Sequence, residues 1–302
     1  MHENAWLYEL ESRGFDVDLP FWVSLIDDYQ PARVLDIACG TGRITFPLLT
    51  AGRARDQSFQ IVGLDNSPQL LELARERAEL LGERDTNPVH FVEGDMRDFD
   101  LNQTFDLIVV GFNSLAYIYT LDDHRDCLHT IRRHLAPGGH FAIDLIVPQL
   151  SFLAEEQTSV PVMRLELDVT APEQGVKRLL RFATERYDPI TQTDDTTYFY
   201  EIYYTDGRHE RFTDDLAWHM YYPRELTMLL EDAGFRPAER YGSYQKAAFG
   251  PRSMHYLWVM AADDEEPRTE DSGPSVSPRH VLSPERVLRW RRSHGDRLSP
   301  QS

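Results

Sequence analysis

One stretch of the chain decides its fold: Arg33-Val-Leu-Asp-Ile-Ala-Cys-Gly-Thr-Gly-Arg43. Its first five residues are mostly aliphatic or β-branched, which predicts a short buried strand. Gly40 and Gly42 follow, and apolar residues at helical spacing begin at Ile44. Glycine permits positive φ and close approach of a ligand to the backbone, and the start of a helix offers free N–H groups. The stretch therefore predicts a strand, a ligand-binding turn and a helix.

The turn does not match the dinucleotide-binding fingerprint G-x-G-x-x-G, because Thr45 stands where the third glycine is required. This mismatch disfavours a nicotinamide-dependent oxidoreductase. The sequence instead reads Asp36-x-x-x-Gly40-x-Gly42, with an acid at the end of the strand. A carboxylate at that position suits a ligand with an ammonium or hydroxyl group, and it would repel a pyrophosphate.

Strands and helices alternate through most of the chain. Strand-like runs cover 59–65, 89–93, 105–110 and 140–146, and helical patterns lie between them. Near-continuous apolar strands that alternate with helices are typical of a parallel, doubly wound sheet. We therefore predict an α/β fold with a seven-stranded Rossmann-like sheet. The remaining predicted elements are a helical lead-in at 1–30, a helix at 223–233 and strands near 236–241 and 254–262.

Residues 151–220 interrupt this alternation. Four strand-like runs, at about 162–170, 176–187, 195–205 and 208–220, have no helical period, and Asp206-Gly207 is a strong hairpin signal. We predict an antiparallel β-meander that is inserted as a substrate lid into an α/β domain of residues 31–150 and 221–262. Residues 263–302 are rich in Pro, Ser and charged side chains, so we expect a disordered tail.

Composition excludes several classes of protein. The formal net charge of −19 disfavours binding to a nucleic-acid backbone. No apolar run approaches the ~20 residues needed to cross a bilayer, and the N-terminus has no signal-peptide pattern. Two cysteines, Cys39 and Cys127, are too few for a disulfide framework, and no Cys/His spacing predicts a metal site. We expect a cytoplasmic protein without a nucleic-acid or membrane partner, and the sequence leaves a homo-oligomer open.

Acids end three successive predicted strands: Asp36, Asp65 and Asp95. The carboxyl ends of parallel strands meet along one edge of an open α/β sheet, where ligands bind. The glycine turn together with these acids resembles the cofactor-binding motifs of class I S-adenosylmethionine-dependent methyltransferases. The resemblance covers about residues 18–146 and 223–262, including Gly63-Leu-Asp-Asn-Ser67 and Leu135-Ala-Pro-Gly-Gly139.

The resemblance implies that S-adenosylmethionine is the cofactor and lies across this edge of the sheet. It implies that Asp65 accepts hydrogen bonds from the ribose hydroxyls, that Asp95 and Met96 lie beside the adenine, and that Asp36 meets the α-ammonium group. The other candidate cofactor-binding residues lie in the turn and after the second and fourth strands: Ala38, Gly40, Thr41, Gly42, Asn66 and Phe112. Tyr8 and Phe21 are candidates to roof the methionine end, with core packing as the alternative for each.

The meander and His219-Met-Tyr-Tyr-Pro223 resemble the small-molecule branch of that family, which contains glycine-type and amino-sugar N-methyltransferases. This implies transfer of a methyl group to a small-molecule acceptor, with an amine nitrogen favoured. Such transfer needs alignment in a dry pocket, and a protonated nucleophile also needs a base. The candidate catalytic residues are His219, Asn113 and Tyr221, and the candidate substrate-binding residues are Tyr117, Tyr204 and Tyr222.

Other functions stay open at this point. An O-methyltransferase would share the cofactor site, and so would a peptide or protein N-methyltransferase, whose basic substrate an acidic surface attracts. A nucleic-acid methyltransferase ranks lower, because residues 113–116 read Asn-Ser-Leu-Ala instead of an Asn/Asp-Pro-Pro-aromatic motif. A protein that binds S-adenosylmethionine as a regulator or assembly partner, without turnover, would also share this fold.

Overall fold

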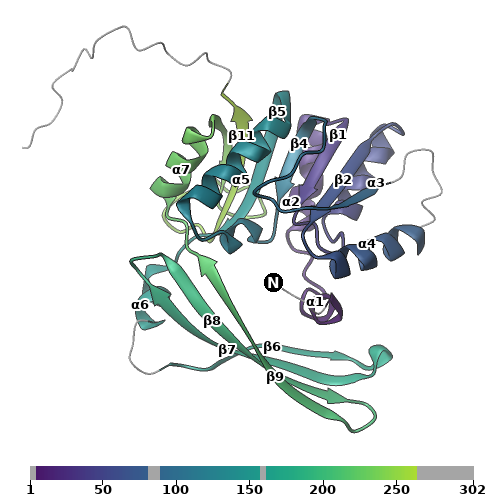
Figure 1. Ribbon diagram of the computed structural model, residues 1–302, viewed down its shortest axis with the longest axis vertical. Helices are drawn as coiled ribbons and strands as arrows, with labels where there is room; N and C mark the ends of the chain where they lie inside the picture. Colours follow the sequence, from purple (N-terminus) through teal and green to yellow (C-terminus); the bar gives the residue numbers. More distant parts are fainter. Residues whose placement is uncertain (1–4, 81–88, 157–160, 264–302) are drawn as a thin grey trace, which may run out of the picture. The chain divides into compact units, whose positions relative to one another are not determined.

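The computed structural model describes residues 5–80, 89–156 and 161–263, and these residues contain a larger and a smaller sheet (Figure 1). The strands of the larger sheet are β1 (Arg33–Ile37), β2 (Gln60–Asp65), β3 (His90–Glu93), β4 (Phe105–Val110), β5 (Leu135–Ile146), β10 (Phe235–Tyr241) and β11 (His255–Ala262). Their spatial order is β10-β11-β5-β4-β1-β2-β3, and β11 runs antiparallel to β5 and β10. The predicted seven-stranded Rossmann-like sheet is thus confirmed.

The neighbouring strands β1 and β4 mark the point where the strand order reverses. Strands β2 and β3 extend the sheet on one side of this pair, and β5, β11 and β10 extend it on the other. In open α/β sheets, ligands bind beyond the carboxyl ends of the strands at such a switch point. The topology therefore directs attention to the loops that follow β1 and β4.

Helices cover both faces of this sheet, because side chains along each strand alternate between the faces. Val34 of β1 packs in one apolar cluster with α2 (Leu19–Tyr29) and α3 (Thr45–Arg55). Leu35 packs in a second cluster with α5 (Leu121–His134) and α7 (Pro223–Asp232). Another helix, α4 (Pro68–Leu80), connects β2 to β3. Strands buried on both faces explain the near-continuous apolar runs of the sequence.

The smaller sheet is the predicted antiparallel meander. Its strands, in spatial order, are β6 (Arg164–Ala171), β7 (Val176–Asp188), β8 (Thr193–Tyr204) and β9 (His209–His219). Tyr198 and Tyr200 on one face of β8 are buried in a cluster with Leu7 and Leu10 of α1 (Ala5–Glu11). Figure 1 shows α1 between the meander and the α/β body, on the side of α4.

Several elements differ from the sequence-based prediction. β5 begins at Leu135, before the Pro137-Gly138-Gly139 turn, because Leu135 already pairs with Phe105 of β4. Two short elements, α6 (Leu150–Glu156) and the 3-10 helix η1 (Ser114–Tyr117), were not predicted, since one or two turns carry little periodicity. The predicted tail at 263–302 lies outside the described residues after Asp263. Within the described ranges, no helix combines the length and apolarity that a membrane span requires.

Candidate functional site

The glycine turn after β1 exposes its backbone. Ala38, Gly40 and Gly42 all have positive φ, at 56°, 56° and 83°. A Cβ atom built on Gly40 would lie 3.2 Å from the Tyr8 hydroxyl, so the turn and α1 approach closely only because this residue is glycine. The turn is held to β2 by the hydrogen bond that the Cys39 N–H donates to the Leu64 carbonyl, at 3.1 Å.

Asp65, at the end of β2, ties the turn to the next helix. Its Oδ2 accepts a hydrogen bond from the Gly40 N–H at 2.8 Å, and its Oδ1 accepts one from the Ser67 N–H at 2.9 Å. The residue is 7% exposed, and burial raises the pKa of its carboxyl group. A carboxylate has about four lone-pair positions, so Asp65 keeps capacity to accept further hydrogen bonds from ligand hydroxyls.

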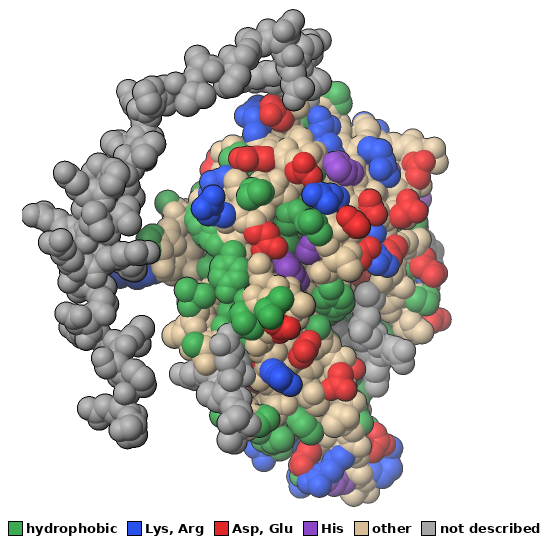
Figure 2. All heavy atoms as spheres, turned by 60° about the vertical axis from the view of Figure 1, so that its left-hand side comes forward, with side chains coloured by type: hydrophobic (Ala, Val, Ile, Leu, Met, Phe, Trp, Pro, Cys, Tyr) green, Lys and Arg blue, Asp and Glu red, His purple; other side chains and the backbone are tan. Residues whose placement is uncertain are grey.

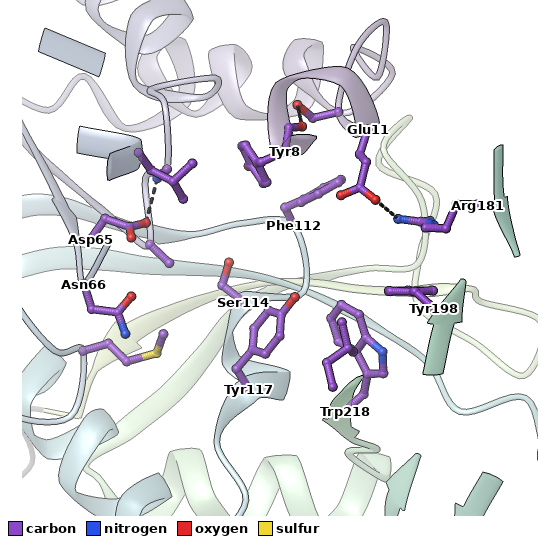
Figure 3. A pocket seen from close by; sticks show the side chains of 16 residues that line it. Tyr8, Glu11, Asp65, Asn66, Phe112, Ser114, Tyr117, Arg181, Tyr198 and Trp218 are labelled. Atoms are coloured by element: carbon purple, nitrogen blue, oxygen red, sulfur yellow. Dashed lines mark hydrogen bonds and ion pairs between the residues drawn. The ribbon is translucent and has the colours of Figure 1, made fainter. Parts of the chain in front are cut away.

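A cavity of about 220 Å³, the cofactor-side cavity, lies against this edge of the sheet. Figure 3 shows Asp65 and Asn66 on one side of it and Arg181 and Tyr198 on the other, with Tyr8 above. The predicted cofactor- and substrate-binding residues that line it are Ala38, Gly40, Asp65, Asn66, Met96, Phe112 and Tyr117. Leu70 and Ser114 also line this cavity and were not predicted from the sequence.

Four predicted cofactor-binding residues lie next to the cavity without lining it. Asp36 is 1% exposed behind the turn, where its Oδ2 accepts a hydrogen bond from the Thr45 hydroxyl at 2.6 Å and burial raises its pKa to about 7. Thr41 donates its hydroxyl to Glu9 of α1. A Cβ on Gly42 would come within 2.5 Å of the Phe46 ring. These three residues therefore shape the turn from behind.

Asp95 is the fourth of these residues, and its carboxylate is occupied. Both of its oxygens accept hydrogen bonds from the Arg97 guanidinium, at 2.6 to 3.1 Å, and this pairing lowers the pKa of Asp95. The side chain therefore points to Arg97, and Met96 is the residue of this loop that lines the cavity. The placement of Asp95 beside the adenine stays a prediction, because no finding tests it.

Helix α1 is fastened over the turn by a small polar network. Glu9 contacts Thr41 and accepts a hydrogen bond from Arg77 of α4 at 2.7 Å, and Arg77 also donates to the Thr41 carbonyl at 3.1 Å. Tyr8 lines the cavity, and burial raises the pKa of its phenol to about 12, so the hydroxyl stays protonated. Phe21 lies in the apolar core instead, 1% exposed, which is the alternative that the sequence left open.

A second cavity of about 600 Å³, the acceptor-side cavity, adjoins the first, and Phe112, Tyr198 and Trp218 line both. Its other polar lining residues come from distant segments: Asn113, Asp144, Gln149, Glu166, Glu185, Asp194, Tyr244 and His255. The sequence pattern located only Asn113 among them. Asp144 did carry a signal, since it is an acid near the carboxyl end of the predicted strand 140–146, as Asp65 is in its own strand.

Asp144 organises one wall of the acceptor-side cavity. It is 3% exposed, its Oδ2 accepts a hydrogen bond from the Tyr244 hydroxyl at 2.9 Å, and its Oδ1 lies 3.1 Å from His255 Nδ1. Next to it, the Asn113 side chain accepts a hydrogen bond from the Ile146 N–H at 3.0 Å. The wall thus contains a tyrosine–aspartate–histidine network.

His219 lies outside both cavities, because neighbouring strand residues point to opposite faces. Trp218 faces the cavities, so His219 faces α5 and α7. There it is 6% exposed, its ring centroid lies 4.8 Å from that of His124, and its Nε2 lies 3.0 Å from Glu225 Oε1. This corrects the predicted placement of His219 at the reacting groups.

Three predicted tyrosines are also engaged elsewhere. Tyr221 is 3% exposed and donates its hydroxyl to the Leu115 carbonyl at 2.9 Å. The Tyr222 hydroxyl lies 3.0 Å from that of Tyr187, and Tyr204 donates to Glu210 at 3.0 Å near the hairpin end of β8. None of the three lines either cavity, so the structure gives them packing contacts instead of the predicted contacts with an acceptor.

Comparison with known proteins agrees with this architecture. Residues 34–139 match a family model described as a methyltransferase domain. A dTDP-4-amino-2,3,4,6-tetradeoxy-D-glucose N,N-dimethyltransferase from Saccharopolyspora spinosa is 37% identical over 111 residues, which are 37% of this chain and 39% of the relative. The cypemycin N-terminal methyltransferase of Streptomyces sp is 29% identical over 244 residues, which are 79% of this chain and 86% of that protein.

Among solved structures, an S-adenosylmethionine-dependent methyltransferase from Clostridium acetobutylicum ATCC 824 has the same fold. It aligns with a TM-score of 0.68 and 17% identity over 85% of this chain and 97% of that chain. Residues 34–139 therefore match a methyltransferase domain, and the described α/β body has the fold of an S-adenosylmethionine-dependent methyltransferase. Its relatives include amino-sugar N,N-dimethyltransferases, although the chain spans only 39% of the length of the first of them.

The residues of the cofactor-side cavity fit S-adenosylmethionine, the cofactor of this class. Ala38 and Gly40 present backbone without bulky side chains, and Asp65 and Asn66 offer acceptors and donors for vicinal hydroxyls. Leu70 and Met96 line the same cavity with apolar side chains suited to a flat ring. Tyr8 also lines this cavity, and Phe112 lines both cavities.

Proposed function

We propose that this protein transfers a methyl group from S-adenosylmethionine to an amine nitrogen of a small-molecule acceptor. The observation that carries the proposal is the junction of the two cavities at Phe112, Tyr198 and Trp218. One cavity borders the glycine turn and Asp65, and the other is large enough for a small organic molecule. An acceptor atom at this junction is next to the proposed cofactor position.

The chain's own residues supply alignment and water exclusion, which are the main needs of methyl transfer. When bound, S-adenosylmethionine supplies a sulfonium methyl group that the acceptor's lone pair displaces. The rings of Tyr117 and Trp218 lie 4.8 Å apart, and those of Phe15 and Phe112 lie 5.1 Å apart. These rings give the cavities apolar walls near the junction, and aromatic faces attract cationic groups.

His255 is our proposed base. An aliphatic amine is mostly protonated at neutral pH, with a pKa near 10.4 for lysine as a guide, so it must lose a proton before it can attack. His255 lines the acceptor-side cavity, and Asp144 beside its Nδ1 fixes the tautomer in which that nitrogen carries the hydrogen. Nε2 is then the atom that accepts the proton, and Tyr244 holds Asp144 in place.

The names of the relatives favour a nitrogen atom as the acceptor of the methyl group. One acts on the amine of a dTDP-linked sugar and another on an N-terminus, and both are named as methyltransferases of those groups. The second candidate function is therefore methylation of an N-terminal amine, because the cypemycin enzyme matches 79% of this chain. On the face shown in Figure 2, acidic and basic side chains are interspersed, and with a net charge of −19 the chain is poorly suited to a polyanion such as nucleic acid.

The test combines binding with turnover. Calorimetry with S-adenosylhomocysteine measures cofactor binding, and labelled S-adenosylmethionine then reports methyl transfer to an amino sugar, a peptide N-terminus and the matching hydroxyl compounds. We expect cofactor binding and transfer to an amine. Transfer to hydroxyl compounds alone would make the protein an O-methyltransferase, and binding without transfer to any class would favour a regulatory protein. Absence of cofactor binding would refute the proposal.

A further inference from the structure

The wall of the acceptor-side cavity that the meander contributes is acidic. Glu166, Glu185 and Asp194 line it. Directly opposite residues on antiparallel strands share a face, and Asp194 of β8 lies opposite Trp218 of β9. Asp194 and Tyr198 also share this face, because they are four residues apart on one strand. Asp194 therefore lies on the meander face that carries Tyr198 and Trp218, and Glu166 and Glu185 line the same cavity.

Two of these acids have an arginine side chain as ion-pair partner, whereas Asp194 accepts a hydrogen bond from the Arg186 backbone N–H and has no ion pair among the described residues. Arg181 pairs with Glu166 at 3.2 Å, and Arg164 pairs with Glu185 at 3.1 Å. Asp194 is 2% exposed, and its Oδ1 has no hydrogen-bond partner among the residues that the structure describes. Burial, followed by the neighbouring Glu185 and Asp195 carboxylates, raises the pKa of Asp194 to about 7. The cavity thus holds one buried carboxylate whose charge no described side chain balances.

An unpaired buried carboxylate is costly for a fold, and such groups gather at binding sites. The cation that would balance Asp194 is one that enters the cavity. It is not the amine that receives the methyl group, because that amine must lose its proton, and a carboxylate beside it would hold the proton in place. Asp194 suits a second group that stays charged.

We infer that the acceptor carries a second cationic group, an ammonium or guanidinium, and that Asp194 binds it in the acceptor-side cavity. This inference rests on the proposed function and names the class of its substrate: a small, at least dicationic amine. It also disfavours an acceptor that carries a diphosphate into this cavity, as a dTDP-linked sugar would, because phosphate charge would meet the acidic wall.

The experiment uses the full chain saturated with S-adenosylhomocysteine at pH 8. Calorimetry measures the affinity of α,ω-diaminoalkanes of three to six carbons and of the monoamines of the same lengths. We expect at least one diamine to bind about tenfold or more tightly than its monoamine, as one charge-assisted pair predicts. Asp194→Asn should abolish this preference. Asp195→Asn is the matched control, because Asp195 is the next residue on β8 and is exposed, and it should leave the preference intact.

The outcomes separate this inference from the proposed function. Equal affinity for diamine and monoamine in the unmodified protein, or an unchanged preference in Asp194→Asn, would overturn the inference while cofactor binding and amine methylation stand. A dTDP-linked amino sugar that is methylated more efficiently than every dicationic amine would overturn it as well. Failure of S-adenosylhomocysteine to bind would instead remove the proposed function itself. A folding defect in Asp194→Asn would appear as weaker cofactor binding, which the same titration records.

Discussion

The two cavities that meet at Phe112 differ in how the chain builds them. The cofactor-side cavity takes its polar edge from residues 38–40 and 65–66, which lie at the ends of two neighbouring strands. The acceptor-side cavity takes its polar wall from Asp144, Asp194 and His255, which lie on β5, on the meander and on β11. The polar residues of the first cavity thus belong to short sequence motifs, whereas those of the second are brought together only by the folding of the whole chain.

This difference separates what the fold shares from what is individual to this protein. In our proposal the glycine turn and Asp65 bind S-adenosylmethionine, the cofactor common to the class. The meander and the loops after β4 and β5 line the acceptor-side cavity, and we propose that they select the acceptor. Folds of this kind carry different functions through the sites that are added to a common frame. Here the added site is the acceptor-side cavity, which is lined by acidic and aromatic side chains.

The largest expected effect concerns the acceptor side. His255→Gln should lower kcat for methyl transfer by about 10²- to 10⁴-fold, the usual contribution of a general base, with the affinity for S-adenosylhomocysteine unchanged. Asp144→Asn should lower kcat in the same direction, because it releases the imidazole from its fixed tautomer. Steady-state kinetics with labelled cofactor measures both, and exposed His129 on α5 provides the control His129→Gln. An unaltered kcat in His255→Gln would assign the base to another residue.

The next effect concerns the cofactor edge. Asp65→Asn replaces a carboxylate that accepts from Gly40 and Ser67, and hydrogen bonds to charged groups contribute about 1.5–3 kcal/mol each. We expect the affinity for S-adenosylhomocysteine to fall about 10²-fold by calorimetry, since about 1.4 kcal/mol is tenfold. Asp126→Asn, at an exposed position on α5, is the control. If affinity falls less than threefold, Asp65 has only a structural role.

These two predictions also mark how far sequence reasoning reached. The strand-end acids were found because parallel strands place their carboxyl ends along one edge, which a period of two and a sheet topology suffice to predict. Asp144 lies at the same edge, but Tyr244 and His255 join it from 100 and 111 residues further along the chain. No spacing rule connects such positions, because only the pairing of β11 with β5 brings them together.

The choice between Trp218 and His219 shows a second limit. Both residues follow the alternating pattern of β9, and alternation alone does not indicate which face of the strand borders the cavity. The His219 side chain can accept a proton and the Trp218 side chain cannot, so residue type favoured the histidine as the catalytic candidate. The pairing of Asp194 with Trp218 places the tryptophan on the face that borders the cavity, and this register depends on the whole meander.

A smaller effect concerns the stability of the acceptor wall. The pKa of Asp194 is raised from 3.8 to about 7 in the folded protein, so ionisation favours the unfolded chain. The destabilisation is absent below about pH 4, grows between about pH 4 and 7, and is constant above that range. Asp194→Asn should therefore raise the free energy of unfolding by about 1–3 kcal/mol at pH 8 and leave it nearly unchanged at pH 4. Urea titrations at both values measure this, and a loss of stability at pH 8 would show that the carboxylate has a structural partner.

The smallest effect on catalysis is expected where sequence reasoning placed chemistry and the structure places packing. Tyr221→Phe removes the hydroxyl that donates a hydrogen bond to the buried Leu115 carbonyl. Such a loss costs about 1–3 kcal/mol of stability because the carbonyl is left without a partner. Tyr119→Phe is the matched control: its hydroxyl also donates to a carbonyl, that of Ala217, but the residue is 46% exposed and water replaces the bond. We expect Tyr221→Phe to lower the unfolding midpoint more than Tyr119→Phe. We expect kcat and KM to stay within about twofold of the unmodified protein, because a residue outside the cavities affects stability and not turnover. A large fall in kcat for Tyr221→Phe at unchanged stability would show that this tyrosine takes part in catalysis. The site would then extend to the face of the sheet that carries α5 and α7.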